Sequence, residues 1–186
     1  MKTQFTKDEV VFISDTHFGH ANIINYCSRP FDFPNTTEMD RVMLEALKAA
    51  DDAGKTIIHL GDFVFRPDNL LAQDWRPKGE HIIILGNHDK HAGEGGKHRK
   101  LYREFFHHIE GHYKTWPTHF LTIEVDGVKV MLSHVGQTQL MWHKWNFHGH
   151  THNHFDVPMS PQHSNLSVEL TNYKTVTFDE ALLIQR

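Results

Sequence analysis

The sequence predicts an α/β fold built around short strands that end in polar loops. Three apolar segments, at 10–13, 56–60 and 81–85, each run directly into a loop that begins with small or polar residues. An amphipathic segment at 35–54 separates the first two, so strand and helix alternate along this half of the chain. Open α/β sheets place their sites at the carboxyl ends of strands. We therefore expect function to lie in the loops after these three strands.

The segment at 35–54 carries the clearest helical pattern. Asn35 is predicted to cap the helix, with Glu38 three residues later as the second member of a capping box. Gly54 is the expected stop. Between them, apolar residues recur at helical spacing: Met39, Val42, Met43, Ala46, Leu47 and Ala50. The charged residues fall largely on the other face, as in a helix that packs against a sheet.

The second half of the chain alternates apolar and polar residues more often. Asp126-Gly127 separates two alternating segments and is the strongest hairpin signal in the sequence. The remaining expected elements are short: helices at 69–74, at 97–108 and from Asp179, and strands at 120–125, 128–133, 145–148, 164–169 and 175–178. Because no repeat, linker or block of like charge divides the chain, we expect a single domain over residues 1–186.

The composition is mildly acidic, with 19 Lys and Arg against 23 Asp and Glu and a formal net charge of −4. Bulk attraction to nucleic acid or anionic lipid is therefore not expected, because such binding needs a basic face. No apolar run exceeds four residues, whereas a membrane-spanning helix needs ~20. We expect no membrane among the partners of this chain.

Cysteine usage and the first residues favour a reducing, cytoplasmic location. The single cysteine, Cys27, cannot form an intramolecular disulfide and is predicted to be a small buried residue beside Tyr26. Charged residues at 7–9 interrupt the chain before any apolar stretch that a secretory signal would need. Histidine, by contrast, is frequent: there are 18, and five of them lie between His143 and His154.

Five short segments bring carboxylate, imidazole and amide side chains into loops. They are Asp15-Thr16-His17, Gly61-Asp62, Gly86-Asn87-His88-Asp89, Ser133-His134 and Gly149-His150-Thr151-His152. Each alone is more often structural than metal-binding, but together they supply the roughly seven donors that a pair of divalent ions requires. Residues two apart on a strand end share a face, and the glycines leave room for close backbone approach. The sequence therefore predicts a metal centre.

The same five segments, in this order over residues 15–152, closely resemble the motif set of the calcineurin-like metallophosphoesterases. The segment 12–31 also looks like the small, uncapped phosphohydrolases of bacteria and their phages within that superfamily. The resemblance implies a four-layer α/β sandwich, with two mixed β-sheets packed face to face and flanking helices. It also implies a metal-dependent phosphoesterase that hydrolyses small phosphodiesters or phosphomonoesters.

The resemblance assigns the metal ligands residue by residue. Asp15, His17 and His152 would hold the first ion, Asn87, His134 and His150 the second, and Asp62 would bridge the two. Two cations ~3.5–4 Å apart lower the pKa of a bridging water, so that a hydroxide nucleophile forms near neutral pH, and they hold the phosphoryl oxygens. These donors suit manganese, iron, zinc, cobalt or nickel. The ions would also attract a phosphoester to this acidic chain.

Two further roles follow from the resemblance. His88 would stay off the metals and protonate or hydrogen-bond the leaving side of the ester, and Asp89 would orient it. His20 and Asn22, just after the first motif, are candidate substrate contacts, although this segment also suits the start of a helix. Valine rather than proline follows His134, which keeps the ligand and leaves the course of the next loop open.

Three alternatives remain. The basic cluster Lys97, His98, Arg99, Lys100 and Arg103 either steers phosphate or forms a solvated helix face. A nuclease acting on nucleic-acid ends would use the same fold and ligands, but the chain shows no extended basic face, so a small phosphoester is the favoured partner. A noncatalytic scaffold of the same fold is disfavoured because His88 is present with every ligand.

Overall fold

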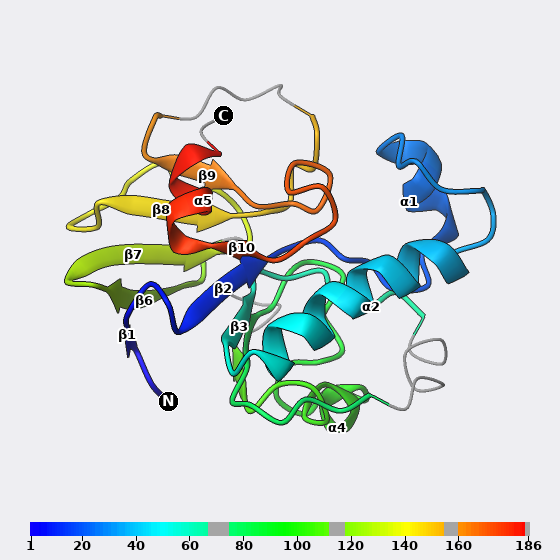
Figure 1. Ribbon diagram of the computed structural model, residues 1–186, viewed down its shortest axis with the longest axis horizontal. Helices are drawn as coiled ribbons and strands as arrows, with labels where there is room; N and C mark the ends of the chain where they lie inside the picture. Colours follow the sequence, from blue (N-terminus) through cyan, green and yellow to red (C-terminus); the bar gives the residue numbers. More distant parts are fainter. Residues whose placement is uncertain (67–74, 112–117, 155–159, 185–186) are drawn as a thin grey trace.

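Ten strands and four helices are defined in this computed structural model, which describes residues 1–66, 75–111, 118–154 and 160–184 (Figure 1). The strands are β1 (Gln4–Phe5), β2 (Val10–Ile13), β3 (Thr56–His59), β4 (Ile82–Ile84), β5 (His108–Glu110), β6 (Phe120–Val125), β7 (Val128–Ser133), β8 (Trp145–His148), β9 (His163–Asn165) and β10 (Val176–Thr177). The helices are α1 (Ala21–Tyr26), α2 (Thr37–Asp52), α4 (Arg99–Tyr102) and α5 (Phe178–Leu183).

The strands form two mixed sheets of five. The first sheet has the order β10-β2-β3-β4-β5, in which β2 to β5 run parallel and β10 pairs antiparallel with β2. The second sheet has the order β1-β6-β7-β8-β9, and its antiparallel pair is β6 with β7. That pair is the hairpin predicted at Asp126-Gly127, and both turn residues have positive φ, at 46° and 79°.

Alternate residues of each strand build two apolar layers. Val10 and Phe12 of β2 face the second sheet, where they share a core with its inner residues Val130 and Phe147. Val11 and Ile13 face the other way, toward α2 and the residues that follow α4. The two sheets therefore pack face to face, with helices on the outer side of the first one. The expected α/β class is confirmed.

The outer face of the second sheet is covered by a loop. The segment 135–144 lies over it, where the Gln137 amide donates to Asn146 Oδ1 at 2.8 Å and His143 Nε2 lies 2.8 Å from Thr122 Oγ1. Every helix of the described residues contributes instead to the two apolar layers. In the part of the chain that the structure describes, the helical layer expected on this side is thus a loop.

The residue that precedes α2 differs from the predicted cap: the N-cap is Thr36, not Asn35. Asn35 does accept a hydrogen bond from the Thr37 amide at 2.9 Å, but Glu38 pairs with Arg41 and leaves the predicted capping box open. The box that does close is Thr177 with Glu180, at the start of α5. None of the helices in the described ranges is long and apolar enough to cross a membrane.

The predicted helix at 97–108 is wrong in extent, because α4 covers only Arg99–Tyr102. Phe105 and Phe106 instead turn into the core, and His108 pairs with Ile82 to begin β5. The strand expected at 164–169 is likewise shortened to β9. The helix expected at 69–74 lies outside the described residues.

Candidate metal centre

The five motif loops meet at one edge of the two sheets. They follow β2, β3 and β4 of the first sheet and β7 and β8 of the second. Parallel strands bring their carboxyl ends to the same edge, and in Figure 1 the arrows of β2 and β7 both point toward the side on which α1 lies. The loops therefore gather side chains that are up to 137 positions apart, from Asp15 to His152.

Three predicted ligands form the first donor group, defined as Asp15, His17 and His152. One ligand atom from each lies within 4.8 Å of the other two. Asp15 Oδ1 is 3.9 Å from His152 Nε2. The other oxygen of Asp15 is fixed, because it accepts hydrogen bonds from Ser167 Oγ at 2.9 Å and the His150 amide at 3.0 Å.

The second donor group comprises Asn87, His134 and His150. Asn87 Oδ1 is 3.1 Å from both His134 Nε2 and His150 Nδ1. Asp62 lies between the two groups: its Oδ2 is 3.5 Å from His17 Nε2 and 3.4 Å from His134 Nε2. All seven predicted ligands are thus brought together, and the position of Asp62 suits the bridging role.

Several donor atoms are buried without a conventional partner. Asp15 Oδ1 and both ring nitrogens of His17 have no hydrogen bond within the described residues, although their residues are at most 1% exposed. Buried polar atoms normally have partners, and each exception calls for an explanation. A divalent ion would satisfy these atoms with the oxygen and imidazole donors it prefers. The residues therefore fit a metal centre.

The backbone is strained at most of the predicted ligands. Five of the seven have positive φ, between 49° and 72°: Asp15, His17, Asp62, His150 and His152. Non-glycine residues seldom adopt this conformation, which costs ~1–2 kcal/mol per residue. Such clustered strain is typical of functional sites, where the surrounding structure enforces a geometry that the chain would otherwise avoid.

Two motif glycines are required by close packing against the carboxylates. A β-carbon at Gly86 would overlap Asp62 Oδ1, and one at Gly149 would overlap Ser14 Oγ and Asp15 Oδ2. Neither position tolerates a larger residue unless a candidate ligand moves. The predicted role of these glycines in close approach is confirmed.

The site concentrates negative charge that must be compensated. Burial raises the pKa of Asp15, but the charges of His152 and His134 outweigh it and bring the pKa to about 2. For the two histidines, burial acts in the opposite direction and lowers the pKa. The nearby carboxylates outweigh it: Asp62 raises the pKa of His134 to about 9, and Asp15 raises the pKa of His152 to about 11. Protons on these histidines balance the carboxylates here, and divalent cations can supply the same charge.

A buried ion pair that no local sequence pattern indicates supports the first donor group. Glu169 Oε1 lies 3.0 Å from His152 Nδ1 and 2.7 Å from a terminal nitrogen of Arg29. Arg29 also donates to the carbonyl oxygens of Asp15, at 2.7 Å, and Thr16, at 3.1 Å. A carboxylate behind a histidine fixes the ring and increases its basicity as a ligand. Glu169 and Arg29 thus position this donor group.

Asp89 has a different role from the one expected. Its Oδ2 accepts from the amides of Asp62, at 2.7 Å, and Gly86, at 2.9 Å, while Oδ1 accepts from the Phe63 amide and the Tyr102 hydroxyl. None of its hydrogen bonds within the described residues reaches His88. The prediction that Asp89 orients His88 is therefore wrong, and this carboxylate instead holds two motif loops together.

The other candidates differ in their access to the site. His88 is exposed, and its ring centroid lies 5.2 Å from that of His17. His20 is only 9% exposed and packs 5.4 Å from His17. Asn22 is exposed on α1, and no contact joins it to the donor groups within the described ranges. His88 and His20 therefore border the centre, whereas Asn22 is not placed there.

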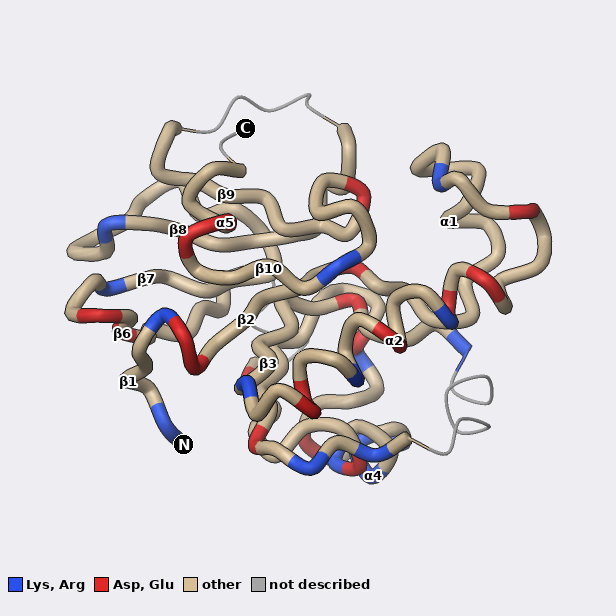
Figure 2. Tube along the Cα trace, viewed as in Figure 1, with Lys and Arg blue, Asp and Glu red and all other residues tan. Residues whose placement is uncertain are grey.

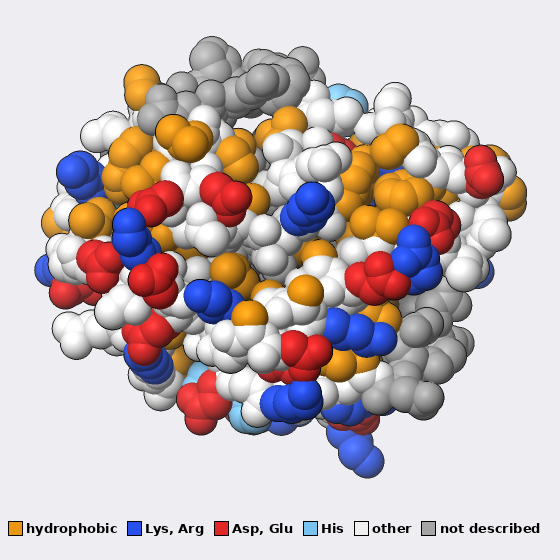
Figure 3. Space-filling view, in the orientation of Figure 1, with side chains coloured by type: hydrophobic (Ala, Val, Ile, Leu, Met, Phe, Trp, Pro, Cys, Tyr) orange, Lys and Arg blue, Asp and Glu red, His pale blue; other side chains and the backbone are white. Residues whose placement is uncertain are grey.

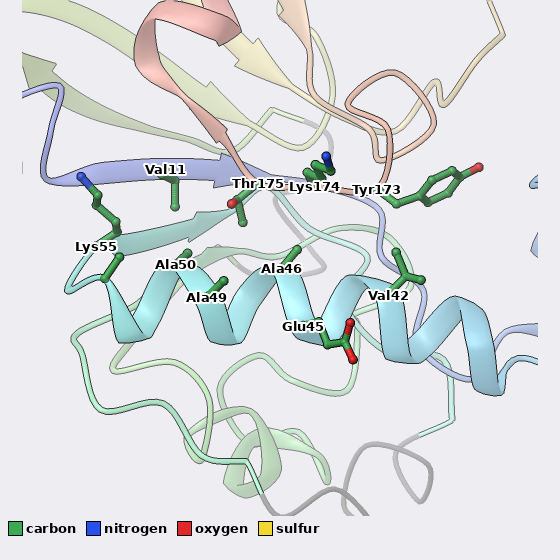
Figure 4. A pocket seen from close by; sticks show the side chains of 11 residues that line it. Val11, Val42, Glu45, Ala46, Ala49, Ala50, Lys55, Tyr173, Lys174 and Thr175 are labelled. Atoms are coloured by element: carbon green, nitrogen blue, oxygen red, sulfur yellow. The ribbon is translucent and has the colours of Figure 1, made fainter.

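Two other features lie apart from the donor groups. Lys97, Lys100 and Arg103 are exposed, as on a solvated face, whereas His98 and Arg99 are half-buried. Figure 2 shows basic positions along α4. A hollow of about 540 Å³ between α2 and β2, lined by small and apolar residues such as Ala46 and Ala49, contains none of the predicted site residues (Figure 4).

The fold and site define an α/β protein with a candidate binuclear metal centre at one edge of two packed sheets. The chain is 32% identical over 181 residues to the uncharacterized protein MJ1445 of Methanocaldococcus jannaschii, covering 92% of this chain and 88% of the archaeal protein. It belongs to the family of that protein. No protein-family model matches it.

A solved structure shares the fold. The crystal structure of AQ665, a protein of unknown function from Aquifex aeolicus, superposes with a TM-score of 0.67 at 24% identity, covering 92% of this chain and 96% of that chain. This likeness extends across both sheets and supports the architecture described above.

Proposed function

We propose that this protein is a metal-dependent phosphoesterase, built on a metallophosphoesterase-type sandwich, that hydrolyses small phosphodiesters or phosphomonoesters. The observation that carries the proposal is the donor set. Two aspartates, one asparagine and four histidines converge from five loops, and some of their donor atoms are buried without partners. This number and type of donor suits two ions such as manganese, iron, zinc, cobalt or nickel.

The chain offers separate places for two ions. The first donor group would hold one, the second donor group the other, and Asp62 would be shared. Two bound divalent ions would supply positive charge to the phosphoryl oxygens and make a water molecule acidic enough to attack phosphorus. Asn87 adds an oxygen without adding charge, so the carboxylates of Asp15 and Asp62 leave the loaded centre positive.

His88 is the proposed proton donor to the leaving oxygen of the ester. Its imidazole is exposed and lies beside His17 of the first donor group. Its amide donates to Asp62 Oδ1 at 2.8 Å, so the backbone that carries the imidazole is tied to the centre. A positioned acid of this kind typically contributes 10²–10⁴-fold to the rate.

The charge distribution favours a small substrate. Lys and Arg residues are spread along the chain (Figure 2), and the face in Figure 3 mixes acidic and basic side chains. Duplex DNA binding draws on many phosphate contacts along a basic face. One ester phosphate at the metal centre needs no such surface, and so we propose a small phosphoester as the substrate.

The test compares three substrates with Mn²⁺ at two ionic strengths: bis(p-nitrophenyl) phosphate, p-nitrophenyl phosphate and a labelled DNA duplex. We expect hydrolysis of at least one small ester, its loss with EDTA, and weak or no cleavage of the duplex. Duplex cleavage that is faster than ester hydrolysis and suppressed by salt would instead support a nuclease. Metal binding without any hydrolysis would support a noncatalytic scaffold.

A further inference from the structure

An aromatic rim borders the candidate metal centre, formed by His20, Phe65 and Tyr26. The rings of Phe65 and His20 stack face to face, with centroids 3.9 Å apart and planes at 11°. Tyr26, the last residue of α1, meets His20 edge to face at 6.4 Å. The rim therefore joins the end of α1 to the loop after β3, two segments that are distant in the sequence.

Two of the three rings of the rim, those of Phe65 and Tyr26, are exposed to solvent. Phe65 is 46% and Tyr26 63% exposed, whereas His20 beneath them is only 9% exposed. One face of Phe65 rests on His20, so the accessible part of its ring is turned away from the protein. Exposed apolar surface beside a cluster of convergent polar side chains is typical of a ligand-binding site.

The rim lies next to the proposed proton donor, His88. The His88 ring centroid is 6.0 Å from that of Phe65 and 6.2 Å from that of His20. If His88 protonates the leaving oxygen, this oxygen must come within about 3 Å of the imidazole. The group attached to the oxygen then begins within a few ångströms of Phe65, so the ring of Phe65 is within its reach.

We propose that the aromatic rim binds a flat aromatic ring in the ester group of the substrate, so that the enzyme prefers phosphoesters of nucleosides or of other aromatic alcohols. This inference rests on the proposed function and adds its substrate class. Offset or edge-to-face contact with an aromatic ring strengthens binding beyond the burial of apolar area, by roughly three- to tenfold. An aliphatic group of the same size gains the burial alone.

Two matched pairs of esters test the inference. Benzyl phosphate and cyclohexylmethyl phosphate both release a primary alcohol and differ in the aromaticity of the ring. Adenosine 5′-monophosphate and ribose 5-phosphate release the same hydroxyl with and without a nucleobase. We expect kcat/KM to be roughly three- to tenfold higher for the aromatic member of at least one pair. The pair that shows the preference identifies the source of the ring.

The variant Phe65→Leu keeps an apolar side chain but removes the ring. We expect it to abolish the aromatic preference, whereas Phe65→Tyr retains the preference. Trp142→Leu is the matched control, because Trp142 is 63% exposed but stacks on His143 over the outer face of the second sheet. Unfolding midpoints and Mn²⁺ binding verify that each variant is folded and loaded.

The outcomes separate the inference from the proposed function. Hydrolysis of the esters with no aromatic preference in the wild type, or a preference that survives in Phe65→Leu, overturns the aromatic subsite and leaves the phosphoesterase standing. Hydrolysis of bis(p-nitrophenyl) phosphate but of none of these four monoesters overturns the inference and leaves the phosphoesterase standing. Failure to hydrolyse the four monoesters, p-nitrophenyl phosphate and bis(p-nitrophenyl) phosphate alike, in protein that binds Mn²⁺, overturns both.

Discussion

The two donor groups of the candidate metal centre differ in how firmly the protein holds them. In the first donor group, Asp15 accepts a hydrogen bond from Ser167, and His152 contacts Glu169. Glu169 in turn forms an ion pair with Arg29. In the second donor group, His134 Nδ1 rests on the Leu60 carbonyl at 2.8 Å. Within the described residues, the first group has a carboxylate of its own, Asp15, and a second one, Glu169, that contacts a histidine ligand.

This difference predicts two sites of unequal affinity. A carboxylate ligand adds Coulomb attraction to a cation, and an outer carboxylate raises the basicity of the histidine in front of it. The second group contributes imidazole and amide donors and shares Asp62 with the first. We therefore expect the first ion to bind more tightly and the second to exchange more readily.

The largest effect should come from Asp62→Asn, because this residue belongs to both sites. We expect the variant to lose at least one ion per chain and to lose more activity than the roughly 100-fold that removal of an outer partner costs. Elemental analysis and ester hydrolysis measure the two effects. Asp52→Asn, an exposed change on α2, is the control. Full metal content in Asp62→Asn would show that Asp62 does not bridge.

His88→Asn should lower the rate of ester hydrolysis without changing Mn²⁺ binding at either metal site. We expect turnover to fall by about 10²–10⁴ for an ester that leaves as an alkoxide and far less for one that leaves as nitrophenolate. The reason is that a nitrophenolate departs without a proton. Mn²⁺ binding should be unchanged in calorimetry. An equal loss with both leaving groups would assign His88 to phosphate binding instead.

Glu169→Gln separates the two sites most directly. We expect the tighter Mn²⁺ affinity to fall by about 10–100-fold while the weaker one changes little, because Glu169 contacts His152 alone among the candidate ligands. Calorimetric titration of the metal-free protein resolves the two steps. Glu104→Gln, which removes an exposed ion pair with Arg76, is the matched control. Equal weakening of both steps would refute the division into two groups.

The smallest effect concerns His59, which supports the first donor group by its 3.0 Å contact with Thr16. Burial lowers the pKa of His59 from 6.5 to about 3. A histidine whose pKa is lowered on folding contributes stability in full above pH 6.5 and loses it as the pH falls toward 3. Between these values its loss is about 1.4 kcal/mol per pH unit.

Denaturant unfolding of the metal-free protein between pH 7 and pH 5 measures this dependence. His59→Gln should remove the uptake of about one proton on unfolding, and so reduce the slope of unfolding free energy against pH by about 1.4 kcal/mol per pH unit. The other buried histidines should maintain the rest of the slope. An unchanged slope would mean that His59 is not held neutral by burial.

The sequence was most informative where polar and ligand-type residues recur directly after predicted strands. The hairpin at Asp126-Gly127, the strands before the five motifs and the seven candidate ligands follow from local pattern and from the family resemblance, and the structure brings those seven side chains together. Their service as ligands is still a proposal. The αL backbone at the ligands could not be predicted, because tertiary contacts impose it against local preference.

What the sequence missed depends on distant contacts. Glu169 is 140 positions from Arg29, so no local pattern links the pair that positions His152. Asp89 stands next to His88 in the sequence, yet its side chain turns to the backbone of another loop. The helix expected at 97–108 was cut short because Phe105 and Phe106 are needed in the core.

The number of divalent ions bound per chain decides whether the five motif loops form a binuclear metal centre. Protein purified without added metal or chelator is analysed for its elements, then dialysed to equilibrium against Mn²⁺. We expect two ions per chain in the loaded protein, the first bound more tightly than the second. Protein that is folded but binds no Mn²⁺, and carries none of the other candidate metals as isolated, would show that these loops do not form a metal centre.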